Sequence, residues 1–365
     1  MKEIVKVGEI CEILDSQRVP ITARNRVVGP YPYYGANGVQ DYVNDYIFDD
    51  ELVLLAEDGG NFGSKEKPIA YRVSGKCWVN NHAHVLKPKP GLNVDYLCYS
   101  LMFYDVSSLV NGATRQKLTQ SDMRKMEIPM RSIKEQHNIV LQLGKINHMV
   151  LVREKELLLL DELIKARFVE MFGNEMNDGI PLKDCCIDVR GGGTPSMQHP
   201  EYYGGDVPFI KSGDVRGDTV SSGALWLTEQ ALSETTAKYV PKGSVLVVNR
   251  SASLLREFRA AIAIQPVVIN QDIKAFIPRK EFTSEYLLWA IKIQTQLLLT
   301  KVTTVLTSHI DLKDLLDLRI VPASIERQKD FSIFINQVDK SKVAVQKALD
   351  EAQVLFDSLM QQYFG

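Results

Sequence analysis

The chain contains two copies of one sequence pattern, about 190 residues apart. Residues 128–136 read Ile-Pro-Met-Arg-Ser-Ile-Lys-Glu-Gln, and residues 321–328 read Val-Pro-Ala-Ser-Ile-Glu-Arg-Gln. Each copy opens a long heptad-patterned run that closes on Phe-Gly, at 172–173 and at 364–365. Weaker matches lie upstream at closely similar offsets, in the same order along the chain. Such a repeat indicates that one structural unit is present twice, which favours a ligand with two similar parts.

The heptad-patterned runs predict two long helices. Apolar residues alternate at four- and three-residue spacing, which is typical of a coiled-coil seam. The predicted seam residues are Ile146, Leu157, Leu160 and Ile164 in the first run, and Val338, Val345, Leu349 and Phe356 in the second. Polar seam positions differ between the runs: Arg153 and Arg167 interrupt one, and Lys342 interrupts the other. Such mismatches can fix one pairing register, although each stripe could instead pack only on its own globular domain.

The length of 365 residues exceeds one ordinary core and fits two domains with connectors. The predicted fold class is α+β, with two similar domains at 1–130 and 179–323. Long helices at 131–178 and 324–365 would separate the domains and pack antiparallel as a coiled coil. Strands are expected near 52–56, 69–73, 207–210, 244–248 and 260–264, and short helices at 96–104 and 287–299. A helix of some 40 residues would span about 60 Å, which makes the pair a rigid spacer.

Composition favours a cytosolic protein. No apolar run approaches the ~20 residues that cross a membrane, and the first residues lack the apolar core of a signal peptide. The five cysteines show no C-x-x-C pair, so we expect reduced thiols, no disulfide and no structural zinc. The net charge of −2 neither suggests nor excludes nucleic acid, which would require basic residues gathered on one face.

Four segments of the first domain are rich in Gly, Asn and aromatic residues: 31–38, 56–63, 80–84 and 111–117. Amide side chains can contact adenine edges, arginine and lysine can contact guanine, and lysine and threonine suit phosphates. Singly, each segment could be an ordinary turn, but together they fit a surface that reads polar edges. The predicted DNA-contacting residues of this domain are Tyr34, Asn37, Asn61, Asn81, His82, Thr114, Arg115 and Lys117.

The second domain carries a glycine-rich segment at 190–196 and a second polar segment at 202–214, and residues 249–251 follow a predicted strand. Its predicted DNA-contacting residues are Lys211, Arg216, Arg250, Arg256, Gln271 and Lys274. Arg250 could equally serve a structural ion pair.

Signatures of catalysis are missing from the sequence. The glycine-rich segment lacks the terminal Gly-Lys-Ser/Thr of a phosphate-binding loop, and no G-x-S-x-G motif or convincing acid–base pair is present. His82 and His84 alternate as in a strand and would face the same side, but no cysteine or third histidine lies nearby. We therefore predict neither catalytic residues nor a metal site.

These segments together resemble the specificity subunit of type I restriction–modification systems. The resemblance covers essentially the whole chain and rests on Tyr-Pro-Tyr-Tyr-Gly-Ala-Asn-Gly at 31–38, Gly-Gly-Thr-Pro-Ser at 192–196, Tyr-Tyr-Gly-Gly-Asp at 202–206 and the repeated Pro-x-Gln helix starts. It implies two target recognition domains, each reading one half of a bipartite, gapped site in double-stranded DNA. The helices would set the gap and dock two modification subunits.

The resemblance also implies that the chemistry belongs to partner subunits. Modification subunits would bring S-adenosylmethionine, and restriction subunits would bring Mg and ATP-driven translocation and cleavage. This chain shows no methyltransferase tetrapeptide such as Asn-Pro-Pro-Tyr, so no cofactor is expected in it. Alternatives are the DNA-reading subunit of a related fused system, a coiled-coil scaffold whose two domains bind protein or sugar without a DNA role, and an independent nuclease.

Overall fold

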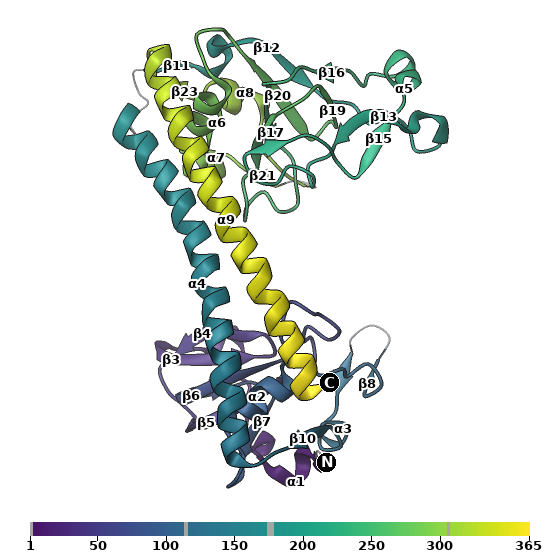
Figure 1. Cartoon of the computed structure of the whole chain (residues 1–365), viewed down its shortest axis with the longest axis vertical. Coiled ribbons are helices and arrows are strands. Elements are labelled where there is room, and N and C mark those ends of the chain that lie inside the picture. Colours follow the sequence, from purple (N-terminus) through teal and green to yellow (C-terminus); the bar gives the residue numbers. More distant parts are fainter. Residues whose placement is uncertain (1–2, 113–115, 174–178, 305–306) are drawn as a thin grey trace. The chain divides into compact units, whose positions relative to one another are not determined.

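The computed structural model describes residues 3–112, 116–173, 179–304 and 307–365. The chain forms two compact units, of which unit 1 comprises Met1–Glu154 and Gln346–Gly365, and unit 2 comprises Lys155–Val345. Each unit contains one β-rich domain, here called domain 1 or domain 2, together with one part of each of two long helices (Figure 1). The predicted α+β class, with two β-sheet domains and two long helices that pack together, is confirmed.

Domain 1 is built on a six-stranded sheet of order β2-β7-β5-β6-β3-β4, and two small two-stranded sheets, β1-β10 and β8-β9, accompany it. The strands are β1 (Glu3–Lys6), β2 (Cys11–Ile13), β3 (Val28–Gly35), β4 (Gly38–Val43), β5 (Phe48–Ala56), β6 (Ala70–Val79), β7 (Ala83–Pro88), β8 (Val110–Asn111), β9 (Lys117–Leu118) and β10 (Glu127–Met130). The short helices are α1 (Val7–Ile10), α2 (Val94–Met102) and α3 (Gln120–Met123).

The core of domain 1 lies around the central strand β5. Residues 52–56 of this strand are buried without interruption, as expected of a strand covered on both faces. The helix α2 packs against β5, β6 and β7 and buries Tyr96 and Leu97 completely. It begins after Asn93, whose side-chain oxygen accepts hydrogen bonds from the backbone N–H groups of Asp95 and Tyr96, an N-cap that the apolar pattern alone did not locate.

Domain 2 repeats this arrangement with a divided sheet. One sheet has the order β12-β20-β17-β18-β14 and another has the order β15-β13-β19-β16. The strands are β11 (Ile180–Pro181), β12 (Cys186–Gly191), β13 (Tyr203–Ile210), β14 (Thr219–Val220), β15 (Leu225–Leu227), β16 (Tyr239–Val240), β17 (Val245–Val248), β18 (Ala260–Ala263), β19 (Val267–Ile269), β20 (Ile273–Pro278), β21 (Thr303–Thr304), β22 (Ser308–His309) and β23 (Arg319–Ile320). The helices are α5 (Glu229–Glu234), α6 (Ser284–Lys292), α7 (Thr295–Thr300) and α8 (Leu312–Leu316).

Two buried glutamines join each domain to a long helix in the same way. In unit 1, Gln136 accepts a hydrogen bond from the Asn93 N–H at 2.7 Å and donates to the Gly91 and Arg131 carbonyls at 3.0 and 2.9 Å. In unit 2, Gln328 accepts from the Thr283 N–H at 2.8 Å and donates to the Glu281 and Ala323 carbonyls at 2.9 and 2.8 Å. Both side chains are fully buried, so the repeated segment, from Pro129 to Gln136 and from Pro322 to Gln328, marks the joint between each domain and its long helix.

The two long helices are α4 (Ile133–Phe172) and α9 (Ile325–Phe364). Ser132 and Glu135 form a reciprocal capping box at the start of α4. At the start of α9 the Ser324 hydroxyl accepts from the Arg327 N–H without a reciprocal acidic partner.

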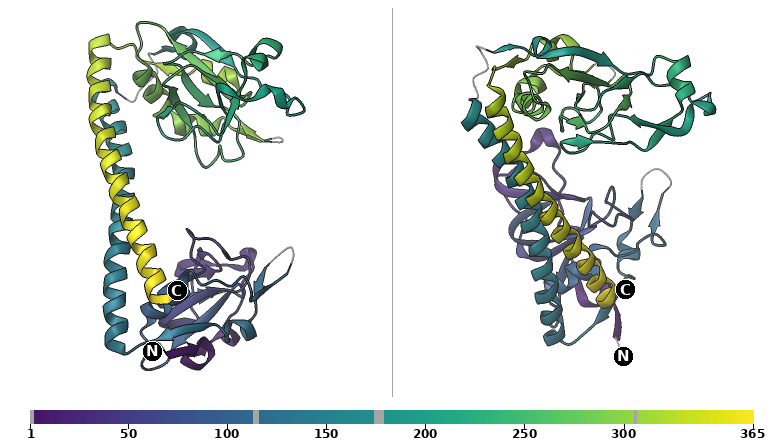
Figure 2. Two further views of the ribbon diagram at one scale, coloured as in Figure 1. Left: turned by 45° about the vertical axis from the view of Figure 1, so that its right-hand side comes forward. Right: turned by 45° about the horizontal axis from the view of Figure 1, so that its top comes forward.

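The helices run antiparallel within each unit. Arg131, just before α4, donates to the Tyr363 carbonyl near the end of α9. Arg327, at the start of α9, donates to the Met171 carbonyl near the end of α4. In unit 1 the C-terminal part of α9 accordingly lies beside the N-terminal part of α4 (Figure 2). Each arginine supplies a donor to a carbonyl that helix geometry leaves without a partner in its own helix.

The predicted seam positions turn inward to different extents. Ile146, Ile164, Val338, Val345 and Phe356 are buried, whereas Leu157, Leu160 and Leu349 are half-buried. All of the buried ones except Val345 belong to a hydrophobic cluster that includes the core of the domain of their own unit. Phe356, for example, lies in the cluster that holds Ile139, Leu143 and the core of domain 1, while Ile164 and Val338 share a cluster with the core of domain 2.

Lys342 is a polar residue in the seam, and its ammonium group lies 2.6 Å from the Asp161 carboxylate of α4. It also lies 3.7 Å from Asp339 of its own helix and 3.7 Å from Asp218 of domain 2. Burial opposes its charge, but the hydrogen bond to Asp161 and the surrounding carboxylates raise the pKa of Lys342 above its ordinary value. This cation therefore ties α4, α9 and domain 2 together within unit 2.

All five cysteines are free and buried, and burial raises the pKa of Cys11 and Cys186 to about 12, so these thiols are unreactive at neutral pH. Among the described residues, no helix is both long and apolar enough to cross a membrane.

Candidate nucleic-acid interface

The four polar segments of domain 1 meet at residues 57–59, directly after the central strand β5. Asn37 of the first segment donates to the Gly59 carbonyl at 3.0 Å. His82 of the third segment lies 2.6 Å from the Asp58 carboxylate. Lys117 of the fourth segment pairs with Asp58 in an isolated β-bridge, and its ammonium group lies 2.9 Å from the Glu57 carboxylate. Segments up to 80 residues apart in the chain therefore form one continuous polar edge.

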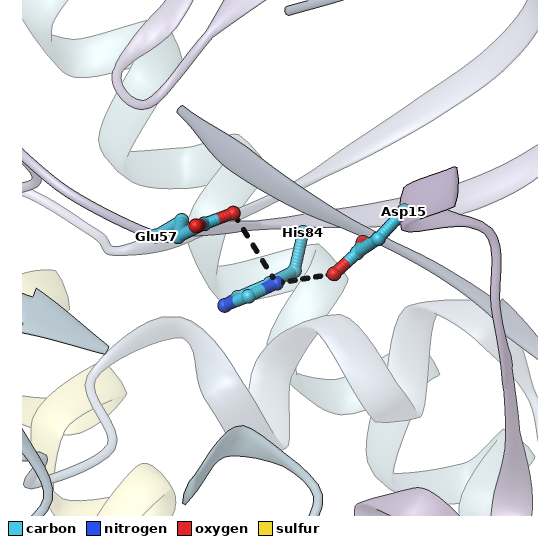
Figure 3. A group of neighbouring side chains, drawn as sticks. All are labelled: Asp15, Glu57 and His84. Carbon is cyan, nitrogen blue, oxygen red and sulfur yellow. Dashed lines mark hydrogen bonds and ion pairs between the residues drawn. The ribbon is translucent and has the colours of Figure 1, made fainter. Parts of the chain in front are cut away.

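A buried network of ion pairs and hydrogen bonds stabilises the segments that form this edge. His84 is fully buried, and its Nδ1 lies 2.7 Å from Asp15 while its Nε2 lies 2.9 Å from the Leu118 carbonyl. Both partners are acceptors, so the ring satisfies both only when it carries a proton on each nitrogen. Figure 3 shows the ring between the Asp15 and Glu57 carboxylates. Because Leu118 belongs to β9, the network holds the base of the fourth segment in place.

The carboxylates of this network are ionised. Burial alone would raise the pKa of Asp15, but hydrogen bonds from His84 and Gln120 and the charge of His84 hold that pKa below its ordinary value. Burial alone would also raise the pKa of Glu57, but hydrogen bonds from the Arg18 and Lys117 side chains hold that pKa below its ordinary value. The Arg18 guanidinium donates to Glu57 at 2.6 Å and to the Ala83 carbonyl at 2.7 Å.

Asp15, Glu57 and His84 are close enough to hold a metal ion, since their ligand atoms all lie within 4.8 Å of one another. Their hydrogen bonds favour a different interpretation, because both ring nitrogens of His84 and oxygens of both carboxylates are already bonded to protein groups. Arg18 and Lys117 also pair with Glu57, and their positive charges would repel a metal ion at this place. We interpret the group as an ion-pair network.

The expectation that His82 and His84 share one strand face was wrong. The strand β7 begins only at Ala83, so His82 lies in the preceding turn. Its ring is half-buried against Asp58 near the surface, whereas the ring of His84 is in the core.

The remaining candidates of domain 1 divide by position. Tyr34, Asn37 and Asn61 line one cavity of about 630 Å³, together with Lys67 and Tyr71. Burial raises the pKa of Tyr34, so its phenol stays protonated and can donate. Asn81 is exposed in the turn before β7. Thr114 and Arg115 lie outside the described residues.

Domain 2 brings its segments together at the equivalent place, after β17. The Thr194 hydroxyl of the glycine-rich segment donates to the Gln271 side chain at 2.5 Å. Arg250 lies 3.9 Å from Asp272 and pairs with His309 in an isolated β-bridge. Lys211 follows the strand β13, whose Ile210 carbonyl accepts from the Asn270 N–H at 3.0 Å.

The other candidates of domain 2 are spread more widely. Arg216 and Arg256 are exposed on loops, whereas Lys274 is half-buried within β20, paired with Gly191 and Val247. Residues that sequence reasoning missed are Asp58, Asp272 and His309, each of which closes a contact between segments. The signal for Asp272 and His309 lay in the repeat, since they stand where the first copy has His82 and Lys117.

Comparison with known proteins agrees with this arrangement. The family described as type I restriction modification DNA specificity domain matches residues 2–151 and 179–352. The chain is 30% identical over 273 residues to a putative type I restriction enzyme specificity subunit of Haemophilus influenzae, covering 68% of this chain and 66% of that one. It is 30% identical over 152 residues to a type I restriction enzyme specificity subunit of Escherichia coli, covering 41% and 38%. These matches span two thirds or less of the relatives' own lengths.

Solved structures show the same fold. The crystal structure of a type I restriction–modification S subunit from M. genitalium superimposes with a TM-score of 0.57 at 14% identity, covering 100% of this chain and 96% of that one. A structure described in terms of complex assembly and conformational transition of the type I system gives 0.55 at 17% identity, covering 99% and 96%.

The family model and the fold shared with the solved structures, a duplicated α+β domain with two long helices, define a DNA specificity protein. The chain belongs to the type I restriction–modification DNA specificity family. The relatives that it matches over less than two thirds of their own length are specificity subunits of such systems.

Proposed function

We propose that domain 1 and domain 2 each read one half of a bipartite site in double-stranded DNA. The observation that carries this proposal is the gathering of separate polar segments at the end of β5 in domain 1 and at the end of β17 in domain 2. Base edges would be read by the amide and charged side chains there, while exposed lysines and arginines would contact phosphates. The different residues at equivalent places would give the two halves different sequences.

The helices α4 and α9 would set the unread gap between the halves. Each contains 40 residues, and such a helix is about 60 Å long, which exceeds one DNA turn of about 34 Å. Antiparallel contacts between the helices in each unit support a rigid spacer of this kind.

The helix α4 also offers a surface for partner subunits. Outside its buried stripe it exposes apolar side chains, Leu141, Met149 and Leu151 in unit 1 and Leu158, Leu159 and Leu163 in unit 2. Exposed apolar groups on a helix are typical of a docking surface. We assign this surface to two modification subunits, which would bring S-adenosylmethionine, while restriction subunits would bring ATP and Mg. Such a complex would act on DNA in the cytoplasm.

The test is a map of methylated adenines in the source genome, with and without this gene. Loss of one bipartite, gapped motif on deletion, restored by the wild-type gene, is the expected result. An unchanged map in cells whose modification subunit co-purifies with this chain would contradict the proposal.

Binding of DNA by the complex should also weaken steeply with salt, because phosphate contacts release counterions. A coiled-coil scaffold that binds protein or sugar would lack this dependence.

A further inference from the structure

The loop clusters of the two domains have one backbone framework. In domain 1 the Glu57 N–H donates to the His82 carbonyl at 2.9 Å, and in domain 2 the Asn249 N–H donates to the Asp272 carbonyl at 3.0 Å. The Leu118 N–H donates to the Glu57 carbonyl at 2.8 Å, and the Ile310 N–H donates to the Asn249 carbonyl at 2.8 Å. Glu57 therefore corresponds to Asn249.

The next residue along each strand end then corresponds as well. Asp58 bridges to Lys117, and Arg250 bridges to His309, in isolated pairs of the same antiparallel type. Asp58 and Arg250 thus occupy the same point of the framework, and His82 and Asp272 occupy a second shared point.

The strand-end point carries a negatively charged side chain in domain 1 and a positively charged one in domain 2. Domain 1 places a carboxylate at the strand end and an imidazole beside it, with Asp58 and His82 at 2.6 Å. Domain 2 places a guanidinium at the strand end and a carboxylate beside it, with Arg250 and Asp272 at 3.9 Å. The backbone framework is the same in both domains, but the strand-end side chain is a hydrogen-bond acceptor in domain 1 and a donor in domain 2.

Both strand-end residues retain capacity for a ligand. The Arg250 side chain is 52% exposed. Its contact with Asp272, at 3.9 Å, is too long for a hydrogen bond. The N–H groups of its planar guanidinium can therefore donate to a ligand. The Asp58 carboxylate lies 2.6 Å from His82, and an ionised carboxylate has about four acceptor sites, so it can accept from a ligand beside its protein contacts.

We infer that Asp58 and Arg250 are equivalent base-reading residues with opposite hydrogen-bonding roles. This inference rests on the proposed reading of one half-site by each domain. Arg250 donates to the O6 and N7 acceptors of a guanine in the half-site of domain 2. Asp58 accepts from the N4 amino group of a cytosine in the half-site of domain 1. Each half-site therefore contains a G·C pair at the equivalent position, read from its guanine in one half and from its cytosine in the other.

The experiment expresses the full chain with its partner subunits in cells that lack this gene, and maps methylated adenines in their DNA. The variants are Asp58→Asn, which is nearly isosteric, and Arg250→Gln, which keeps a polar but shorter and uncharged side chain. Each amide can contact adenine, so each variant should lose its preference for G·C at one position of its own half-site. The expected loss is roughly 5- to 150-fold in the ratio of modification at G·C to modification at other pairs.

Matched controls lie at the opposite ends of the same strands. Asp49→Asn near the start of β5 and Lys242→Gln just before β17 change the charge of each domain by the same amount. They should leave the motif unchanged. The half-site that a variant does not touch serves as its internal control for folding and assembly.

The outcomes separate the inference from the proposed function. If the wild-type gene restores no gapped motif, the proposed function fails. If it restores one and either variant leaves the motif unchanged, or loosens both halves alike, the assignment of these residues fails. Should Arg250→Gln abolish all methylation, Arg250→Lys decides, because lysine retains donors for guanine. Restored methylation with the original motif supports the inference, and continued loss overturns it.

Discussion

Gln136 and Gln328 stand 192 residues apart and hold equivalent sets of backbone groups, one N–H and two carbonyls each. The correspondence continues around them. The Tyr96 hydroxyl donates to the Pro129 carbonyl, and the Tyr286 hydroxyl donates to the Val321 carbonyl. The sequence repeat is therefore a repeat of the joint at which each domain meets its helix.

Replacing Gln136 with Ala should destabilise unit 1 by about 1–3 kcal/mol, because the Asn93 N–H and two carbonyls would be buried without partners. Chemical denaturation, with hydrogen exchange to locate the effect, would measure this change. The Gln353→Ala change on the exposed face of α9 is the control and should stay within about 0.5 kcal/mol. Equal effects of the two changes would show that the joint contributes nothing of its own.

Acid should destabilise domain 1 through Asp15 and Glu57. Their pKa values in the folded chain lie below the ordinary values of 3.8 and 4.5, despite burial, because His84 bonds to Asp15, and Arg18 and Lys117 bond to Glu57. A lowered folded-state pKa contributes stability that is fully present above the ordinary value and is lost as the pH falls through the lowered one. Stability should therefore decline below about pH 4.

The variant Asp15→Asn tests the cause of this acid dependence. It should lower the stability of unit 1 at neutral pH by about 3–5 kcal/mol, because it leaves a buried network without one of its charges. It should also make the acid decline shallower. Hydrogen exchange of peptides from β7, compared with peptides from β20, would measure both effects, corrected for the intrinsic pH dependence of exchange. An identical acid profile in the variant would remove Asp15 from the explanation.

Gln271→Ala should relax recognition in one half-site only. The Thr194 hydroxyl fixes the orientation of this exposed amide, and a lost bidentate base contact costs about 1–3 kcal/mol of discrimination. Methylation mapping of the variant gives the effect at each position of both halves. The matched control is Gln346→Ala, an exposed glutamine of α9 away from both domains' polar segments. Equal relaxation in both halves would exclude this residue from base reading.

Lengthening both helices by one heptad should widen the gap in the DNA site. Insertions next to Leu157 in α4 and next to Val345 in α9 fall close to the boundaries between the two units on each helix. Seven residues add about 10 Å, or about three base pairs of DNA, and preserve the seam. Insertions of three residues, which shift the apolar stripe, should instead prevent assembly. Full activity with an unchanged gap after the heptad insertions would refute the idea that the helices act as a ruler.

The long helices were predictable because the heptad pattern is local. The predicted helical segments 131–178 and 324–365 contain α4 and α9. The second short helix was less predictable, since the expected helix at 287–299 is divided into α6 and α7. Gln294 stands at this division, and its side chain donates to the carbonyls of Ala290 and Arg319, a distant partner that no local pattern reveals.

The candidate site was predicted as segments but not as an arrangement. Asn37, His82 and Lys117 were each identified by residue type, yet their meeting at residues 57–59 depends on the strand order of the sheet. Asp58 was not among the predicted contact residues, since its contacts with His82 and Lys117 join positions 24 and 59 residues away in the chain. The burial of His84 was missed for a similar reason, since a histidine carries no sequence mark of the acids that surround it.

The glutamine joints bind mainly main-chain atoms, and the Met130 sulfur is the one side-chain acceptor recorded for Gln136 among the described residues. A neighbouring side chain can change without removing the N–H or the carbonyls that Gln136 and Gln328 bind, because every residue type except proline supplies both groups. Substitutions can therefore change the surface of either domain without removing the attachment of that domain to its helix. Under the proposed function, a gene of this kind could acquire new recognition one half at a time, while the other half and the surfaces of the long helices stay as they were.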